Sequence, residues 1–197
     1  MIYLIIVAIL GVALFCFTQY QKGKHSEIEK DALQLAWENK DYTSYLAILD
    51  EKIRTSHNRK EKNVLATLKM PAYILKKDWS KMDALKKQVH MKMLTKKFQV
   101  TFVSQYIIGL CLADRPKEAL AWMKHYDTLL KEARNNGTYK LYLNTVDGLK
   151  AFYENDLESA KSLFTEMKAK NIPGDLYDPL FQDYLKRIEE AEKEATE

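Results

Sequence analysis

The sequence has few of the residues that interrupt helices. Its 197 residues include only six glycines and four prolines. It also contains no sustained alternation of β-branched and polar residues, which is the pattern typical of a half-buried strand. Charged residues make up 29% of the chain and are rich in Lys and Glu, which favour helices. We therefore expect an all-α protein, and hydrophobic residues at 47% are enough to form a core.

The sequence also lacks the residue clusters that carry most protein chemistry. Its two cysteines, Cys16 and Cys111, stand far apart, and no Cys/His set has the spacing of a zinc site. The four histidines are scattered, and no P-loop, H-E-x-x-H, G-x-S-x-G or G-x-G-x-x-G motif occurs. We expect no catalytic residue, no metal site and no cofactor, and interpret the chain as a non-enzymatic protein. An enzyme with an unrecognised site is an alternative.

Charge is absent from the first 21 residues, which contain a continuous apolar run over 2–17. The run is at the short end of the roughly 17–25 residues that cross a bilayer as a helix. A cleaved signal peptide needs basic residues before the run and a small-residue cleavage site after it, and both are missing. A lipoprotein signal usually has a small residue before its cysteine, but Phe15 precedes Cys16. The sequence predicts a transmembrane anchor over 1–20 and a juxtamembrane linker over 21–26.

The flanks of this anchor predict its orientation. Lys22 and Lys24 follow it directly, whereas only the α-amino group precedes it. Positively charged flanks stay in the cytoplasm, so we expect a single-pass protein of the cell membrane with a cytoplasmic C-terminal domain. An unpaired Cys111 agrees with a reducing compartment. The alternative is an outward-facing domain that acts as an envelope assembly or chaperone-like factor.

An aspartate recurs four times where one predicted helix ends and the next begins. The four residues are Asp41, Asp78, Asp114 and Asp156, at spacings of 37, 36 and 42. An aspartate at an N-cap accepts a hydrogen bond from a free backbone N–H and suits the positive end of the helix dipole. We therefore predict that each aspartate caps the second helix of a helical hairpin, within a helical-repeat domain over 27–195.

Small residues in the last hairpin predict where two helices approach closely. Gly148 lies on the first helix and Ala160 on the second, with Phe164 and Met167 following on the same face as Ala160. The preceding hairpin has corresponding residues at Ile107, Ala119, Met123 and Tyr126.

This pattern resembles the tetratricopeptide repeat, closely over 98–170 and loosely over 27–97, where Tyr45 and Met82 occupy small-residue positions. The resemblance implies antiparallel helical hairpins stacked as a short solenoid, of a kind used as protein-binding scaffolds. A last amphipathic helix after Asp178 would close the solenoid as a cap. Pro71 is expected to kink a helix of the second hairpin. An irregular helical bundle is the alternative.

Positive charge is concentrated in residues 52–97, which hold 14 Lys and Arg residues against three Asp and Glu residues. The resulting +11 contrasts with −7 over the rest of the chain. The candidate partner-binding residues in this segment are Lys76, Lys77, Lys86 and Lys87. The segment is interpreted as a solvated face, a contact for anionic lipid, or a docking site for an acidic protein. Nucleic acid is the weakest candidate, because no recognised motif accompanies the charge. The chain is thus predicted to be a membrane-tethered scaffold or adaptor for a protein partner.

Overall fold

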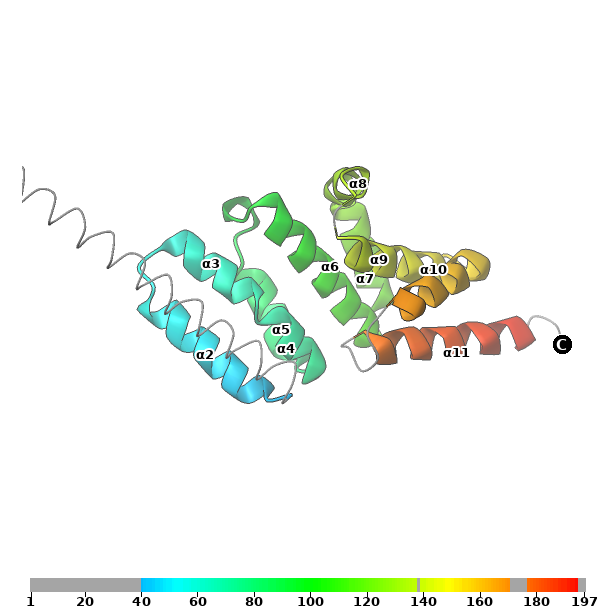
Figure 1. Ribbon diagram of the computed structural model, residues 1–197, viewed down its shortest axis with the longest axis horizontal. Coiled ribbons are helices and arrows are strands. Elements are labelled where there is room, and N and C mark those ends of the chain that lie inside the picture. The colour runs from blue at the N-terminus through cyan, green and yellow to red at the C-terminus, as the bar shows by residue number, and fades with distance from the viewer. Residues whose placement is uncertain (1–39, 138, 171–176, 195–197) are drawn as a thin grey trace, which may run out of the picture. The chain divides into compact units, whose positions relative to one another are not determined.

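The computed structural model describes residues 40–137, 139–170 and 177–194. All regular structure in these ranges is helical, and no strand occurs in them (Figure 1). The all-α prediction is therefore confirmed for this part of the chain. The predicted anchor over 1–20 and linker over 21–26 lie outside the described residues. None of the helices that are described combines the length and the apolarity needed to cross a bilayer.

The chain divides into two compact units, Met1–Arg54 and Thr55–Glu197. The described part of the first unit consists of Lys40, Asp41 and helix α2 (Tyr42–Thr55), whose last residue belongs to the second unit. Tyr45 and Leu49, one helical turn apart on α2, are both buried.

The second unit is a stack of helices around α6. In chain order it contains α3 (Arg59–Thr67), α4 (Met70–Leu75), α5 (Trp79–Gln88), the short 3-10 helix η1 (Met91–Met93), α6 (Lys96–Leu112), α7 (Pro116–His125), α8 (Asp127–Asn135), α9 (Lys140–Tyr153), α10 (Leu157–Lys170) and α11 (Asp178–Glu194). Helix α6 contacts α4 and α5 on one side and α7 and α9 on the other (Figure 1). Every residue from Phe102 to Cys111 is buried, which is the pattern of a helix enclosed on all faces by the core.

Three pairs of successive helices, α4–α5, α6–α7 and α9–α10, are closed by the same backbone turn. Each of the three turns has one residue in the left-handed conformation. In chain order these are Lys77, Asp114 and Asn155, with φ of 53°, 56° and 65°. In each turn the following N–H donates to a carbonyl five residues earlier, and the three pairs are Asp78 to Tyr73, Arg115 to Leu110 and Asp156 to Ala151, each at 2.9 Å. This Schellman pattern satisfies the free carbonyls at a helix end and reverses the chain.

The predicted caps are correct at three of the four aspartates. The backbone N–H groups of Ser44, Lys81 and Ser159 donate to the carboxylates of Asp41, Asp78 and Asp156, respectively. The prediction is wrong for Asp114, which takes the left-handed turn position, so that Arg115 becomes the N-cap and forms no side-chain cap. Pro116 explains this shift, because a residue before proline is disfavoured in helical conformation. Aspartate tolerates the left-handed conformation better than most residues.

Two further features of the second unit differ from the expected hairpins. The helix predicted to kink at Pro71 is instead divided, since α3 ends at Thr67 and α4 begins at Met70. Pro71 lies in the first turn of α4, where its missing N–H costs little. Helix α8 is an additional element between the second and third of these hairpins. It accounts for the longer spacing from Asp114 to Asn155.

Candidate functional site

The predicted hairpin residues Gly148, Ala160 and Phe164 are all buried where α9 packs on α10. A Cβ atom at Gly148 would lie only 3.0 Å from Cε1 and Cζ of Phe164. The atoms that fill the space over the glycine therefore come from Phe164, one turn beyond Ala160. The Phe164 ring in turn stacks on Tyr184 of α11, with ring centroids 5.3 Å apart.

The predicted packing residues of the preceding hairpin, Ala119 and Met123, are both buried on α7. Sequence reasoning missed Gly109 on α6, where a Cβ atom would lie 2.5 Å from Sδ of Met82 and 3.1 Å from Cγ1 of Ile74. Gly109 lies outside the repeat pattern because its partners belong to the preceding hairpin. Its position within an apolar helical stretch, in a chain with six glycines, was the available indication.

The four candidate partner-binding lysines fall into two separated pairs. Lys76 and Lys77 lie in the turn between α4 and α5, whereas Lys86 and Lys87 lie in the last turn of α5. At 1.5 Å per residue, the length of α5 places the pairs roughly 15 Å apart along its axis. Among these four lysines, Lys86 lies over an aromatic ring, with its Nζ 5.2 Å from the ring centre of Trp122.

Two adjoining hollows form a groove along α9, which we call the α9 groove. The first, of about 480 Å³, lies between α7, α8 and α9 and has a floor of Leu120, Met123, Leu130 and Val146. The second, also of about 480 Å³, lies beside α8, α9 and α10 and has a floor of Leu141, Leu143 and Met167. Arg134 and Asp147 line both hollows, so the two hollows adjoin at this pair.

The Arg134–Asp147 pair crosses the middle of the groove and joins α8 to α9. Nε of Arg134 donates to Oδ2 of Asp147 at 2.8 Å, and Nη2 donates to Oδ1. Two parallel hydrogen bonds fix the planes of the guanidinium and the carboxylate against each other. Both side chains are about one-third exposed, so water screens the charge attraction and the pair acts mainly through its geometry.

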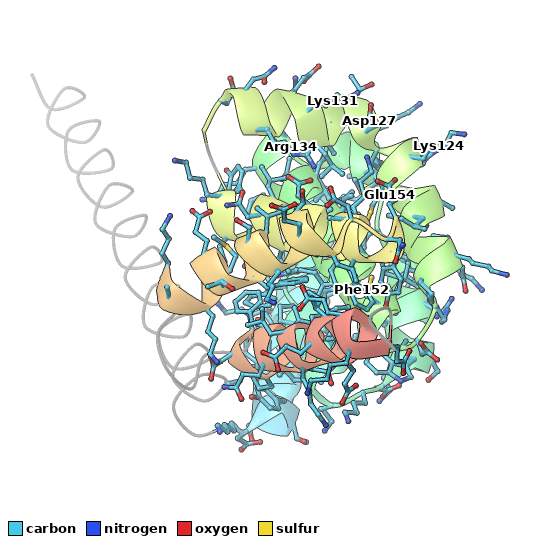
Figure 2. All side chains as sticks on the ribbon, turned by 90° about the vertical axis from the view of Figure 1, so that its right-hand side faces the viewer. Lys124, Asp127, Lys131, Arg134, Phe152 and Glu154 are labelled. Carbon is cyan, nitrogen blue, oxygen red and sulfur yellow. The ribbon has the colours of Figure 1, made fainter. Side chains whose placement is uncertain are left out.

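Charges of both signs alternate along the edges of the groove. On α8, Nζ of Lys131 lies 2.7 Å from Oδ2 of Asp127, and at the end of α9, Nζ of Lys150 lies 3.8 Å from Oε1 of Glu154. The hydrogen bond from Lys131 lowers the pKa of Asp127, with a smaller opposing effect of burial. Lys124 lines the same hollow and makes no ion pair with the described residues. Figure 2 faces this side, with Lys124 and Lys131 on α7 and α8 and Glu154 at the end of α9.

An apolar floor between charged edges can bury apolar groups of a ligand while the rim offers polar contacts. Within the described ranges, no three His, Cys, Asp or Glu side chains gather where they would share a metal ion. The buried thiol of Cys111 lies apart from the groove lining, and burial raises its pKa to about 12.

No protein-family model matches the chain, and no curated protein or solved structure matches it significantly.

Proposed function

We propose that this chain is a non-enzymatic adaptor that is tethered to the membrane through residues 1–20 and binds a segment of a protein partner in the α9 groove. The observation that carries the proposal is the groove itself: two hollows with apolar floors that adjoin at the Arg134–Asp147 pair and are edged by charges of both signs. Such a surface offers burial for apolar side chains and separate polar contacts that fix the orientation of the bound chain.

The repeated turn supports the finer architecture within this proposal. Three hairpins that share one left-handed residue and one backbone hydrogen bond are the units expected of a tetratricopeptide-like solenoid. Helix α11 packs on α10 and presents charged residues on its other face, as a terminal cap requires. Scaffolds of this kind bind proteins in assembly, quality control and regulation, as the resemblance implies.

The dimensions of the groove favour an extended partner segment. Helix α9 has 14 residues and is therefore about 21 Å long. An extended chain covers this length with about six residues, since a strand rises about 3.3 Å per residue. We propose that two apolar side chains of the segment enter the two hollows and that polar backbone or side-chain groups pass the Arg134–Asp147 pair between them.

The proposed location is the cytoplasmic face of the cell membrane, because Lys22 and Lys24 follow the apolar N-terminal run. An outward-facing assembly factor is the alternative location for the same binding surface. Tethering would concentrate the partner at the membrane, which is the role proposed for the adaptor.

Site-specific photo-crosslinking in intact cells tests the binding site. A benzophenone amino acid replaces Lys124, at the first hollow, or Lys140, at the second, in the full-length chain. Lys168 on α10 is the matched control, because it is exposed but does not line either hollow. We expect both groove positions to capture the same partner protein, at neighbouring sites within one short segment, and the control position to capture none of it.

A groove variant completes this test. Leu120→Glu places a carboxylate at a half-buried position in the floor of the first hollow and should abolish capture from Lys140 as well. Circular dichroism of the variant must show unchanged helix content for this comparison. Capture of the same protein with equal yield from Lys168, or capture from Lys140 that survives Leu120→Glu, would show that the α9 groove is not the binding site.

A further inference from the structure

Trp122 of α7 stands at the centre of an aromatic cluster away from the α9 groove. Its ring centroid lies 4.5 Å from that of Tyr106 on α6 and 5.0 Å from that of Tyr126 at the end of α7. The ammonium group of Lys86, on the last turn of α5, lies 5.2 Å from the ring centre. Lys86 therefore makes a cation–π contact with Trp122, within a cluster to which α5, α6 and α7 contribute.

A cavity that does not belong to the α9 groove opens beside this cluster, and we call it the Trp122 hollow. It has a volume of about 400 Å³ and is lined by Val89, Met91, Phe102, Trp122 and Tyr126, with Lys86 and His125 as its basic groups. Every other lining side chain is apolar or aromatic, and no carboxylate lines it. Its volume is large enough to admit one large apolar side chain, and its lining offers apolar contacts.

The carboxylates of Asp83 and Glu118, near the Trp122 hollow, share one arginine. Arg115 donates through Nη1 to Asp83 at 2.8 Å and through Nε to Glu118 at 2.7 Å. The hydroxyl of Tyr106 donates a further bond to Asp83 at 2.7 Å. The positive charge of Lys86 also attracts both carboxylates and helps to lower their pKa values.

The basic side chains next to the lining residues, in contrast, point to solvent. Lys87 and Lys92 are direct sequence neighbours of lining residues, and both are exposed. They form no ion pair with the described part of the chain. Lys86, Lys87, Lys92 and Arg115 outnumber the carboxylates Asp83 and Glu118, and Asp127, which follows Tyr126, pairs with Lys131. The charge around the hollow is therefore positive overall, which favours a ligand of opposite charge.

We propose that the Trp122 hollow binds an acidic segment of a protein partner that carries one large apolar side chain. The apolar side chain enters the hollow against Met91, Phe102 and Trp122. Flanking carboxylates accept charge-assisted hydrogen bonds from Lys86 and Lys87. This site is separate from the α9 groove, so its success or failure does not depend on the function proposed for that groove.

The geometry favours an acidic protein segment over a nucleic acid or a membrane. A base would need a free aromatic face for stacking, but the Trp122 ring is already covered by Tyr106, Tyr126 and the ammonium group of Lys86. An anionic membrane supplies charge across a broad surface, whereas this site combines charge with an open hollow lined by Val89, Met91 and Phe102.

Fluorescence of Trp122 in the full-length chain, kept in a non-ionic detergent, tests the proposal directly. Trp37→Phe and Trp79→Phe leave Trp122 as the only tryptophan. The probe is the acetylated and amidated peptide Glu-Glu-Leu-Glu-Glu. Its two controls replace every Glu by Gln, or Leu by Ala. We expect saturable emission changes with the probe and binding at least about tenfold weaker with either control, since one charged hydrogen bond or one buried side chain is worth about a tenfold change.

Charge variants separate specific binding from general attraction. Lys86→Gln together with Lys87→Gln should weaken the probe at least about tenfold, whereas Lys168→Gln, an exposed lysine of α10, should leave it unchanged. The double reversal Lys86→Glu with Lys87→Glu should instead bind the peptide Lys-Lys-Leu-Lys-Lys.

Three outcomes would overturn the proposal. The first is an emission of Trp122 that does not change with the probe in a correctly folded, helical protein. The second is a loss of probe binding in Lys168→Gln equal to the loss in the Lys86→Gln, Lys87→Gln variant, which would indicate non-specific charge attraction. The third is a Trp122 emission that does not respond to the peptide but does respond to phosphatidylserine vesicles or to a single-stranded oligonucleotide. That result would assign the surface to lipid or to nucleic acid.

Discussion

Gly148 shows how one missing side chain determines a helix contact. The Phe164 ring fills the space that a Cβ atom would occupy, at 3.0 Å. Phe164 cannot move away easily, because it is completely buried and packs against Tyr184 and Phe181, with ring centroids 5.3 and 6.2 Å away. Ala160, one turn before Phe164, is also completely buried.

We predict that Gly148→Ala destabilises the protein, although Gly→Ala in a helix ordinarily stabilises it by about 0.5–1 kcal/mol. Forcing an extra atom against the fixed Phe164 ring costs about 1–3 kcal/mol, so the net loss should be about 1 kcal/mol. Ala160→Leu should cost about 1–3 kcal/mol for the same reason. Urea unfolding followed by far-UV circular dichroism measures both changes.

Ala169→Leu is the control for this prediction, because Ala169 lies on the same helix as Ala160 but is exposed. It should change the free energy of unfolding by no more than about 0.5 kcal/mol. Equal stability of the Ala160→Leu and Ala169→Leu proteins would show that α10 does not pack tightly at Ala160.

The sequence identifies residues whose partners are close along the chain and misses those whose partners are distant. Gly148 and Ala160 could be predicted because one hairpin contains both positions. Gly109 was missed because Met82 and Ile74, which fill its space, come from the preceding hairpin. The cap predicted at Asp114 lies one residue later, at Arg115, because Pro116 disfavours the helical conformation at the residue before it.

At the scale of whole elements, Asp83 joins three helices of the second unit. Its carboxylate on α5 accepts hydrogen bonds from Tyr106 of α6 and from Arg115 at the start of α7. Partial burial raises the pKa of Asp83. The hydrogen bonds from Tyr106 and Arg115 and the positive charges of Arg115 and Lys86 lower it, and together they outweigh the effect of burial. The pKa therefore lies below its ordinary value.

This lowered pKa predicts a pH-dependent contribution to stability. A carboxylate with a lower pKa in the folded than in the unfolded state stabilises the fold above the unfolded pKa of about 4, and the contribution is lost as the pH falls through the folded value. Asp83→Asn should therefore destabilise the protein by about 1–2 kcal/mol at neutral pH and by less at about pH 3. Urea unfolding at both pH values measures the difference.

Asp183→Asn on α11 provides the comparison, since Asp183 forms only a weak 3.9 Å contact with Arg187 on the exposed surface. Its effect should be below about 1 kcal/mol at neutral pH. An Asp83→Asn penalty that is the same at both pH values would mean that the charge of Asp83 does not contribute to the contact between the helices.

The α9 groove illustrates what the sequence does not reveal at this scale. Its lining comes from α7, α8, α9 and α10, and helix α8 itself breaks the repeat spacing. Hydrophobic periodicity predicts which face of each helix is apolar, but it does not predict which faces meet or leave a hollow. Arg134 and Asp147 are 13 residues apart on different helices, so their pairing depends on the angle between α8 and α9.

For the whole molecule, the proposed role depends on the side of the membrane on which the second unit lies. The two lysines after the apolar N-terminal run predict the cytoplasmic side. Cysteine chemistry can test this prediction, because Cys111 is buried and burial raises the pKa of its thiol to about 12. A thiol that is both enclosed and protonated at neutral pH reacts very slowly with maleimides.

An introduced cysteine on the exposed surface therefore reports the topology. Cys16→Ser removes the cysteine in the N-terminal run, and Ser162→Cys adds a thiol at an exposed position of α10. We predict that a membrane-impermeant maleimide labels this protein only after the cell membrane is permeabilised. The Cys16→Ser protein without the added cysteine should remain unlabelled until it is unfolded, which measures the background from Cys111. Labelling of the Ser162→Cys protein in intact cells would instead place the second unit outside, where the α9 groove and the Trp122 hollow would meet partners of the cell envelope.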